Sequence, residues 1–138
     1  MVVFACIKRL SSVAIKNVWE GRCGLLRIYS EPIYINEIIN SILSLSGSPL
    51  FDDLSYIISD WSNVDVTILN AQDIHKISTF VNVISESNRC IKNAIVIPEN
   101  QINIEMALIY KLASNKLSWD INLFKTLLDA RSWVNDCE

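Results

Sequence analysis

The stretch LSYIISD, residues 54–60, is a short apolar run that ends in a carboxylate. A second run of this kind, CIKNAIVIP at 90–98, follows after a helix-like segment. Strands that are covered on both faces read as near-continuous apolar runs, whereas half-exposed strands alternate apolar with polar residues. We therefore predict that both stretches are central strands of a sheet with helices packed on either side.

Strand-like and helix-like segments alternate outward from these two runs. Two strand-like segments, 12–20 and 24–33, are joined by GRCG, a short glycine-flanked link typical of a hairpin. Apolar spacing and capping signals predict four helices, over 34–47, 70–88, 100–115 and 126–136. A last strand is expected over 118–125. The order β-β-α-β-α-β-α-β-α predicts an α/β fold with a mixed, mostly parallel sheet of about five strands.

Length and composition limit the class of protein. The chain of 138 residues fits a single domain over 1–138, with 51% hydrophobic and 20% charged residues. No apolar run approaches the roughly 18 residues that cross a membrane, and the opening MVVFACIKRL lacks the charge order of a signal peptide. We therefore expect a cytoplasmic protein that is not transmembrane. The net charge of −3, without a cluster of Lys and Arg, argues against a nucleic-acid partner.

The cysteines and the single histidine do not form a metal-binding pattern. Cys6, Cys23, Cys90 and Cys137 include no CxxC pair, and His75 is the only histidine. Reduced thiols are the ordinary state in the cytosol. We therefore expect neither a metal nor a cofactor.

Residues that follow parallel strands are expected to share one edge of the sheet, where function tends to gather in α/β folds. Asp60, Trp61 and Ser62 follow the first central strand, and Glu99 follows the second. Two interpretations stay open. Asp60 and Ser62 could bond to turn amides while the indole covers the strand ends. Alternatively, these residues form a recognition or switch surface.

Several segments resemble the small bacterial SpoIIAA-like (STAS-like) proteins. The most telling are SPLFDDLSYIISDWSNV at 48–64, AIVIP at 94–98 and LFKTLLDARSWV at 123–134. The resemblance covers about residues 20–135 and implies the same α/β fold with a regulatory or protein-interaction role. Classical members of the wider superfamily are anti-sigma-factor antagonists that are switched by phosphorylation in an Asp-Ser-Ser-Gly-like loop.

This chain departs from that loop motif. It reads DVTILNAQDI at 65–74, without Ser-Gly, and Thr67 is the nearest hydroxyl before the predicted helix. A phosphate would add about two negative charges and repel an acidic or apolar interface. Thr67 and Ser62 are therefore the candidate switch residues.

The function expected from these features is a non-enzymatic interaction module that forms a homodimer or binds a protein partner. The apolar content favours such an interface, and GxSxG, P-loop and GxGxxG motifs are missing. The alternative is a small apolar-ligand or lipid-binding domain, because segment 100–115 is apolar around much of its girth. A third hypothesis, an enzyme with a carboxylate pair drawn from Asp60, Glu99 and Glu105, has no supporting spacing.

Overall fold

The computed structural model describes residues 14–64, 69–98 and 101–135. Within these ranges the elements follow the predicted order, with one added 3-10 turn, η1 Pro49–Asp53. Two of the candidate residues, Thr67 and Glu99, lie outside the described residues, as do Cys6 and Cys137.

In the described part of the chain, five strands form one mixed sheet in the order β1-β2-β3-β4-β5. The bounds are β1 Ile15–Glu20, β2 Gly24–Tyr29, β3 Tyr56–Asp60, β4 Lys92–Val96 and β5 Asp120–Phe124. The first two strands form an antiparallel hairpin, and each later neighbouring pair is parallel. The predicted fold class, a mixed and mostly parallel α/β sheet, is confirmed.

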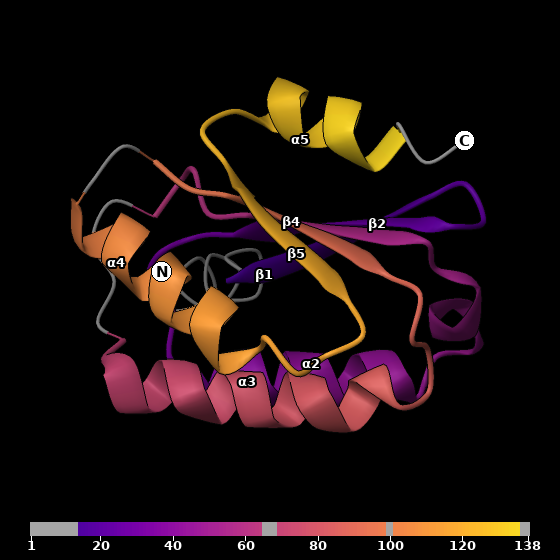
Figure 1. Ribbon diagram of the computed structural model, residues 1–138, viewed down its shortest axis with the longest axis horizontal. Helices are drawn as coiled ribbons and strands as arrows, with labels where there is room; N and C mark the ends of the chain where they lie inside the picture. The colour runs from indigo at the N-terminus through magenta and orange to yellow at the C-terminus, as the bar shows by residue number, and fades with distance from the viewer. Residues whose placement is uncertain (1–13, 65–68, 99–100, 136–138) are drawn as a thin grey trace, which may run out of the picture.

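The α-helices of the described segments cover the two faces of the sheet unequally (Figure 1). Three of them lie on one face: α2 Ile35–Ser46, α3 Ala71–Ser85 and α4 Gln101–Ala113. The fourth, α5 Leu127–Asn135, lies on the opposite face. Each crossover moves the chain one strand further in the same direction. Because such crossovers share one handedness, all three crossover helices lie on the same side of the sheet. The last helix leaves the edge strand and returns over the other side.

Alternate strand residues face the two helical layers, as the pleat requires. On β2, Leu25 and Tyr29 belong to the core beneath the three-helix layer, whereas Leu26 packs towards α5. The core under α5 is the smaller one, and its buried members include Ile58, Ala94, Val96, Ala130 and Val134. The central strands are therefore covered on both faces, which explains their continuous apolar runs.

Local signals set the ends of several elements. Asn70 Oδ1 accepts from the Asp73 N–H at 2.9 Å, and Asp73 Oδ2 accepts from the Asn70 N–H at 3.2 Å. This reciprocal pair is the capping box predicted at the start of α3. Thr126 Oγ1 accepts from the Asp129 N–H and so begins α5. In the hairpin link, Gly21 takes the left-handed backbone at φ 61°, which glycine adopts without a steric cost.

The strands are shorter than predicted, and the second and the fourth differ most from the predicted bounds. The second ends at Tyr29 instead of residue 33, and Pro32 within the excess has no N–H to donate to a ladder. The fourth spans Lys92–Val96 instead of 90–98. Before it, Asn88 turns the chain, because its amide donates to the carbonyls of Phe51 and Leu54.

Candidate functional site

The parallel strands end on one edge of the sheet, and Asp60 is the last residue of β3 there. Its side chain is buried, and Oδ1 accepts from the Ser62 N–H at 3.0 Å and from the Ser62 hydroxyl at 2.6 Å. These two bonds close the turn after the strand. The geometry therefore favours the turn-forming interpretation of Asp60 and Ser62.

Trp61 connects this edge with the interior. The backbone N–H of Trp61 donates to the backbone carbonyl of Val96 at 2.8 Å, which fixes the turn against β4. Its ring stacks on Tyr29 and lines a cavity beneath the edge. Of the three adjacent candidates, Trp61 is the one that reaches this cavity.

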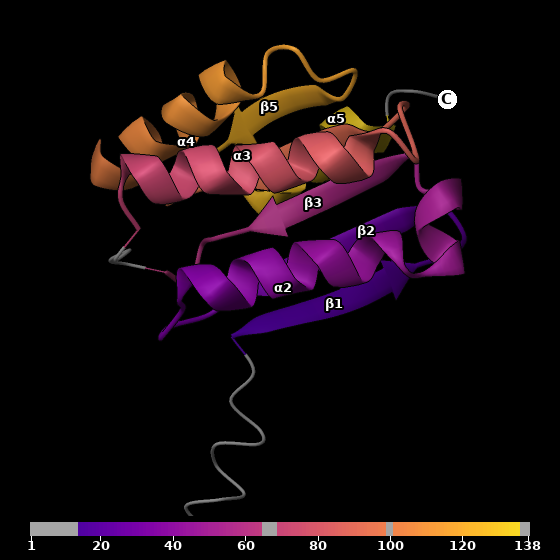
Figure 2. The same ribbon diagram turned by 90° about the horizontal axis from the view of Figure 1, so that it is seen from below.

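The cavity has a volume of about 110 Å³ and lies between the sheet and the α2–α3–α4 layer; α2 and α3 stand in front of the strands in Figure 2. Its helical wall is mostly aliphatic and includes Ile38, Ile42, Leu45, Ile74, Ile77, Val81, Ile84, Met106 and Ala107. An apolar cavity of roughly 150 Å³ holds benzene. This space, called the core cavity below, is therefore of the right order for a compact organic molecule.

Polar side chains reach the core cavity from the inner face of the sheet. Arg27 on β2 lies in register with Ser59 on β3. Asn93 on β4 donates from Nδ2 to Ser59 Oγ at 3.2 Å and to the Ile57 carbonyl at 3.1 Å. From α4, the Tyr110 hydroxyl donates to Asn93 Oδ1 at 3.3 Å. Arg27, Ser59, Asn93 and Tyr110 form the polar row of the core cavity.

Arg27 is a buried cation whose partners are all neutral. It is 2% exposed, and its guanidinium donates from Nε to Tyr29 Oη at 3.1 Å. Nη1 donates to Asn17 Oδ1 at 3.0 Å and Nη2 to Ser41 Oγ at 2.7 Å. No carboxylate in the described part of the chain pairs with it. Buried charges are ordinarily paired with an opposite charge, because desolvating an ion is costly.

The positive charge of Arg27 affects the pKa of Tyr110, on the α4 side of the cavity. Burial raises the pKa of the Tyr110 hydroxyl above its ordinary value, and the nearby Tyr29 raises it further. The positive charge of Arg27 acts in the opposite direction and lowers that pKa. At neutral pH Tyr110 is therefore a neutral hydrogen-bonding group within electrostatic reach of Arg27.

Sequence patterns do not predict Arg27, Ser59 or Asn93 as site residues. They place Arg27, one of several scattered basic residues, on a solvated surface, and this expectation is wrong because Arg27 is buried. Each of the three residues interrupts an apolar run, in GLLRIY, YIISD and KNAIV respectively. Side chains two positions apart face the same side of a strand, so alternation with Leu25 and Ile57 would have placed the first two on the inner face. What was missing was the register that brings the three strands side by side.

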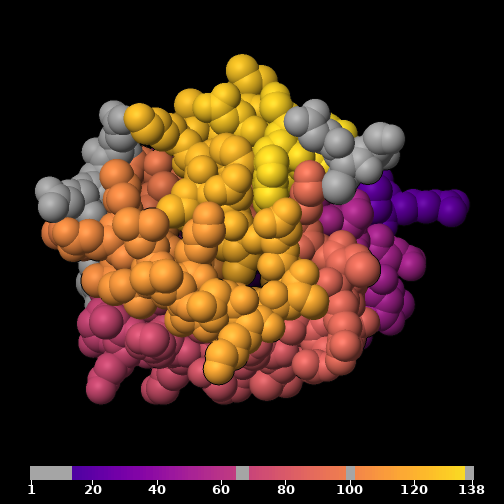
Figure 3. All heavy atoms as spheres, viewed as in Figure 1, coloured from indigo at the N-terminus to yellow at the C-terminus, as the bar shows by residue number. Residues whose placement is uncertain are grey.

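Helix α4 has two apolar faces, which accounts for the apolar girth noted in its sequence. Its inner face lines the core cavity with Asn103, Met106, Ala107 and Tyr110. On its outer face Ile104, Leu108 and Leu112 are spaced four residues apart and are 38%, 47% and 70% exposed. A hollow of about 410 Å³ lies beside Leu108 and Leu112, where α4 meets β5 (Figure 3). These three side chains form the α4 stripe.

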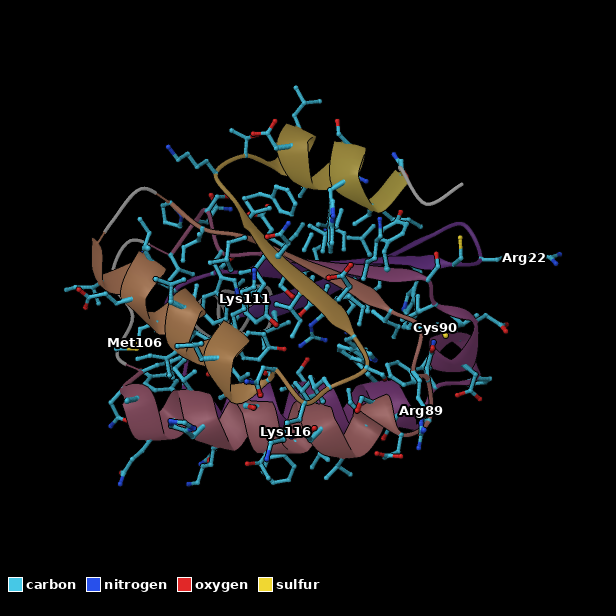
Figure 4. All side chains as sticks on the ribbon, viewed as in Figure 1. Arg22, Arg89, Cys90, Met106, Lys111 and Lys116 are labelled. Atoms are coloured by element: carbon cyan, nitrogen blue, oxygen red, sulfur yellow. The ribbon has the colours of Figure 1, made fainter. Side chains whose placement is uncertain are left out.

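The other chemically suggestive groups do not gather into a site within the described residues. No cluster of three or more His, Cys, Asp or Glu able to hold a metal occurs there. Cys23 and Cys90 are exposed free thiols. Arg22 and Arg89 point outward at the end of the molecule that carries the hairpin turn (Figure 4). No helix in the described ranges is long and apolar enough to cross a bilayer.

No family model matches the chain, and no curated protein or solved structure is significantly similar to it. The SpoIIAA-like assignment therefore stays a prediction from the sequence pattern. The general α/β fold is observed directly in the sheet and its helices.

Proposed function

We propose that the protein is a non-enzymatic binding domain that takes a compact, largely apolar small molecule into the core cavity. The cavity itself carries this proposal: about 110 Å³ of space between aliphatic walls, with a few polar groups on one side. Protein interiors are close-packed and hold few voids larger than a water molecule. Ligand sites, in contrast, combine apolar walls with a small number of placed polar groups.

Filling the cavity from α4 tests this proposal. Ala107 lines the core cavity and is 7% exposed, so Ala107→Leu adds apolar volume there without adding a polar group. Benzene, used as a neutral probe, should shift the isoleucine methyl resonances of the wild-type protein in NMR spectra. It should leave those of Ala107→Leu unchanged.

A matched control is Ala71→Leu, which makes the same change at the exposed first residue of α3. This variant should respond to benzene as the wild type does. Wild-type methyl resonances that do not move at saturating benzene would contradict the proposal.

A second candidate function is the interaction module of the SpoIIAA-like type, acting as a homodimer through the α4 stripe. The stripe exposes three large aliphatic side chains beside a hollow lined by Trp119 and Ile121. A two-fold dimer places the same patch of both copies in contact. The α4 stripe meets this requirement, because an apolar patch can pack against a second copy of itself.

Size-exclusion chromatography coupled to light scattering would test dimerisation. We expect a mass of twice the 15.7 kDa of one chain for the wild type. Leu112→Glu should reduce it to one chain, because a charge would then be buried at the interface. Leu128→Glu, at a leucine on α5 that is 75% exposed, should leave the mass unchanged. A wild-type mass of one chain at all concentrations would exclude this candidate.

A further inference from the structure

We propose that the ligand of the core cavity is an anion, a short-chain monocarboxylate whose carboxylate contacts Arg27 and whose alkyl part lies among the isoleucines of the helical wall. This inference rests on the proposed function, because the cavity must first admit a small molecule. It adds the chemical class of that molecule and the residue that selects it.

Hydrogen-bond donors outnumber acceptors at the Arg27 end of the cavity. The guanidinium has five N–H groups, and its three hydrogen bonds leave one unused on each terminal nitrogen. The Tyr29 and Ser59 hydroxyls each accept a bond, from Arg27 and Asn93 respectively. Within the described residues, neither hydroxyl proton has an acceptor. A carboxylate is an acceptor-only group and supplies what these donors lack.

The single positive charge of Arg27 favours a ligand with a single negative charge. Arg27 is the one cation among the residues that line the core cavity in the described part of the chain, and its present partners are neutral. A monocarboxylate balances that charge, whereas a phosphate dianion would exceed it. The two unused N–H groups are also the number that an end-on bidentate carboxylate engages.

The volume of the cavity limits the length of the alkyl part. At about 110 Å³ it is somewhat smaller than the roughly 150 Å³ cavity that holds benzene. An alkyl part of about four carbon atoms, fewer than the six of benzene, is therefore the expected size. Pentanoate has an alkyl part of this length beyond its carboxylate and is the probe chosen below.

The competing interpretation gives Arg27 a purely structural role. Its bonds to Asn17 on β1 and Ser41 on α2 join the edge hairpin to the helical layer. A cross-link of this kind needs the guanidinium but makes no use of a ligand. The two interpretations differ in what they predict for a charged and a neutral ligand of the same shape.

NMR titrations at pH 7 with pentanoate and pentanamide separate the two interpretations. Pentanamide has nearly the same shape as pentanoate but carries no charge. We expect the wild type to bind pentanoate at least about tenfold more tightly, the scale of one charge-assisted hydrogen bond. Arg27→Met keeps the length of the side chain without its charge and should remove this preference. Arg22→Met, at an exposed arginine that points into solvent (Figure 4), should retain it.

Benzene, titrated in parallel, distinguishes a failure of this inference from a failure of the proposed function. If benzene binds but pentanoate and pentanamide bind equally, the carboxylate assignment is wrong and the cavity remains a ligand site. If neither benzene nor pentanoate binds, both proposals are wrong. A preference for pentanoate that persists in folded Arg27→Met also overturns the assignment. The comparison in the wild type needs no variant, so it decides the question even if Arg27→Met does not fold.

Discussion

The indole of Trp61 lies flat on the phenol ring of Tyr29, with the ring centroids 4.1 Å apart and the planes 11° from parallel. Tyr29 is also the residue that accepts a hydrogen bond from Arg27 Nε. The stack therefore joins the strand-end edge to the charged end of the core cavity. A residue chosen for its place at the end of a strand turns out to form part of the wall of that cavity.

Trp61→Ala should lower both stability and ligand binding. Offset-stacked aromatic pairs contribute about 0.5–1.5 kcal/mol beyond the area they bury, so we expect a loss of about 1–3 kcal/mol in the free energy of unfolding. Trp61→Phe keeps a stacked ring and should lose less than half of that. Urea denaturation measures the loss, and a benzene titration of both variants measures binding. Equal losses for alanine and phenylalanine would show that the stack contributes little.

The fold could be predicted because its signals are local. The apolar runs at 54–58 and 94–97 and the capping pair Asn70 and Asp73 each identify an element without knowledge of its neighbours. The core cavity could not be predicted in this way. Arg27 and Ser59 are 32 positions apart in the chain and meet only through the parallel register of their strands.

The same limit applies to the residues at the strand ends. Sequence placed Asp60 correctly at the end of a central strand, but whether its carboxylate faces a partner or its own turn depends on local backbone geometry. The bonds to Ser62 favour the turn-forming interpretation. For α4, the sequence indicates a helix that is apolar around much of its girth, but only packing separates Tyr110 on the inside from Leu112 on the outside.

Asp60→Ala and Asp60→Asn should differ in stability. Asparagine keeps the Oδ1 acceptor for the Ser62 N–H and hydroxyl, whereas alanine leaves both donors to bond with water. We expect a loss of about 1–2 kcal/mol for alanine and a smaller loss for asparagine, measured by urea denaturation. A loss beyond about 3 kcal/mol for alanine would instead indicate a broken buried network that extends past this turn.

Gly24→Ala, a substitution within β2, should destabilise the protein strongly. A Cβ at Gly24 would overlap the ring and hydroxyl of Tyr56 on the neighbouring strand. The ring would have to move, and its hydroxyl would lose the 2.7 Å bond to Glu20 Oε1. Overpacking of this kind costs typically about 1–3 kcal/mol, which thermal or urea unfolding can measure.

Two further variants test the cause of that loss. Gly47→Ala has no close contact, because its nearest neighbour, the Ser44 carbonyl oxygen, lies 3.6 Å from the added Cβ. It should be neutral or slightly stabilising, since it restricts the unfolded chain. In a Tyr56→Leu background, Gly24→Ala should cost clearly less. An unchanged cost in that background would rule out the overlap with Tyr56 as the cause.

The ion pair between Glu20 and Arg131 should make stability depend on acid pH. Arg131 donates from Nη1 and Nη2 to the two carboxylate oxygens of Glu20, at 2.9 Å and 2.7 Å, which ties α5 to the edge hairpin. These bonds hold the pKa of Glu20 below its ordinary value of 4.5. Because the folded pKa is the lower one, the stabilisation is present above pH 4.5 and is lost as the pH falls through the folded pKa.

Glu20→Gln removes this dependence. The pair is partly exposed, so we expect a loss of about 1 kcal/mol at pH 7. Urea denaturation between pH 7 and pH 3 should show the wild type and Glu20→Gln converging as the carboxylate is protonated. Glu86→Gln is the control. Glu86 forms an ion pair with Arg89, but their side chains are 70% and 68% exposed, so water screens the interaction. If Glu20→Gln and Glu86→Gln differ from the wild type by the same amount at every pH, the bidentate pair does not anchor α5.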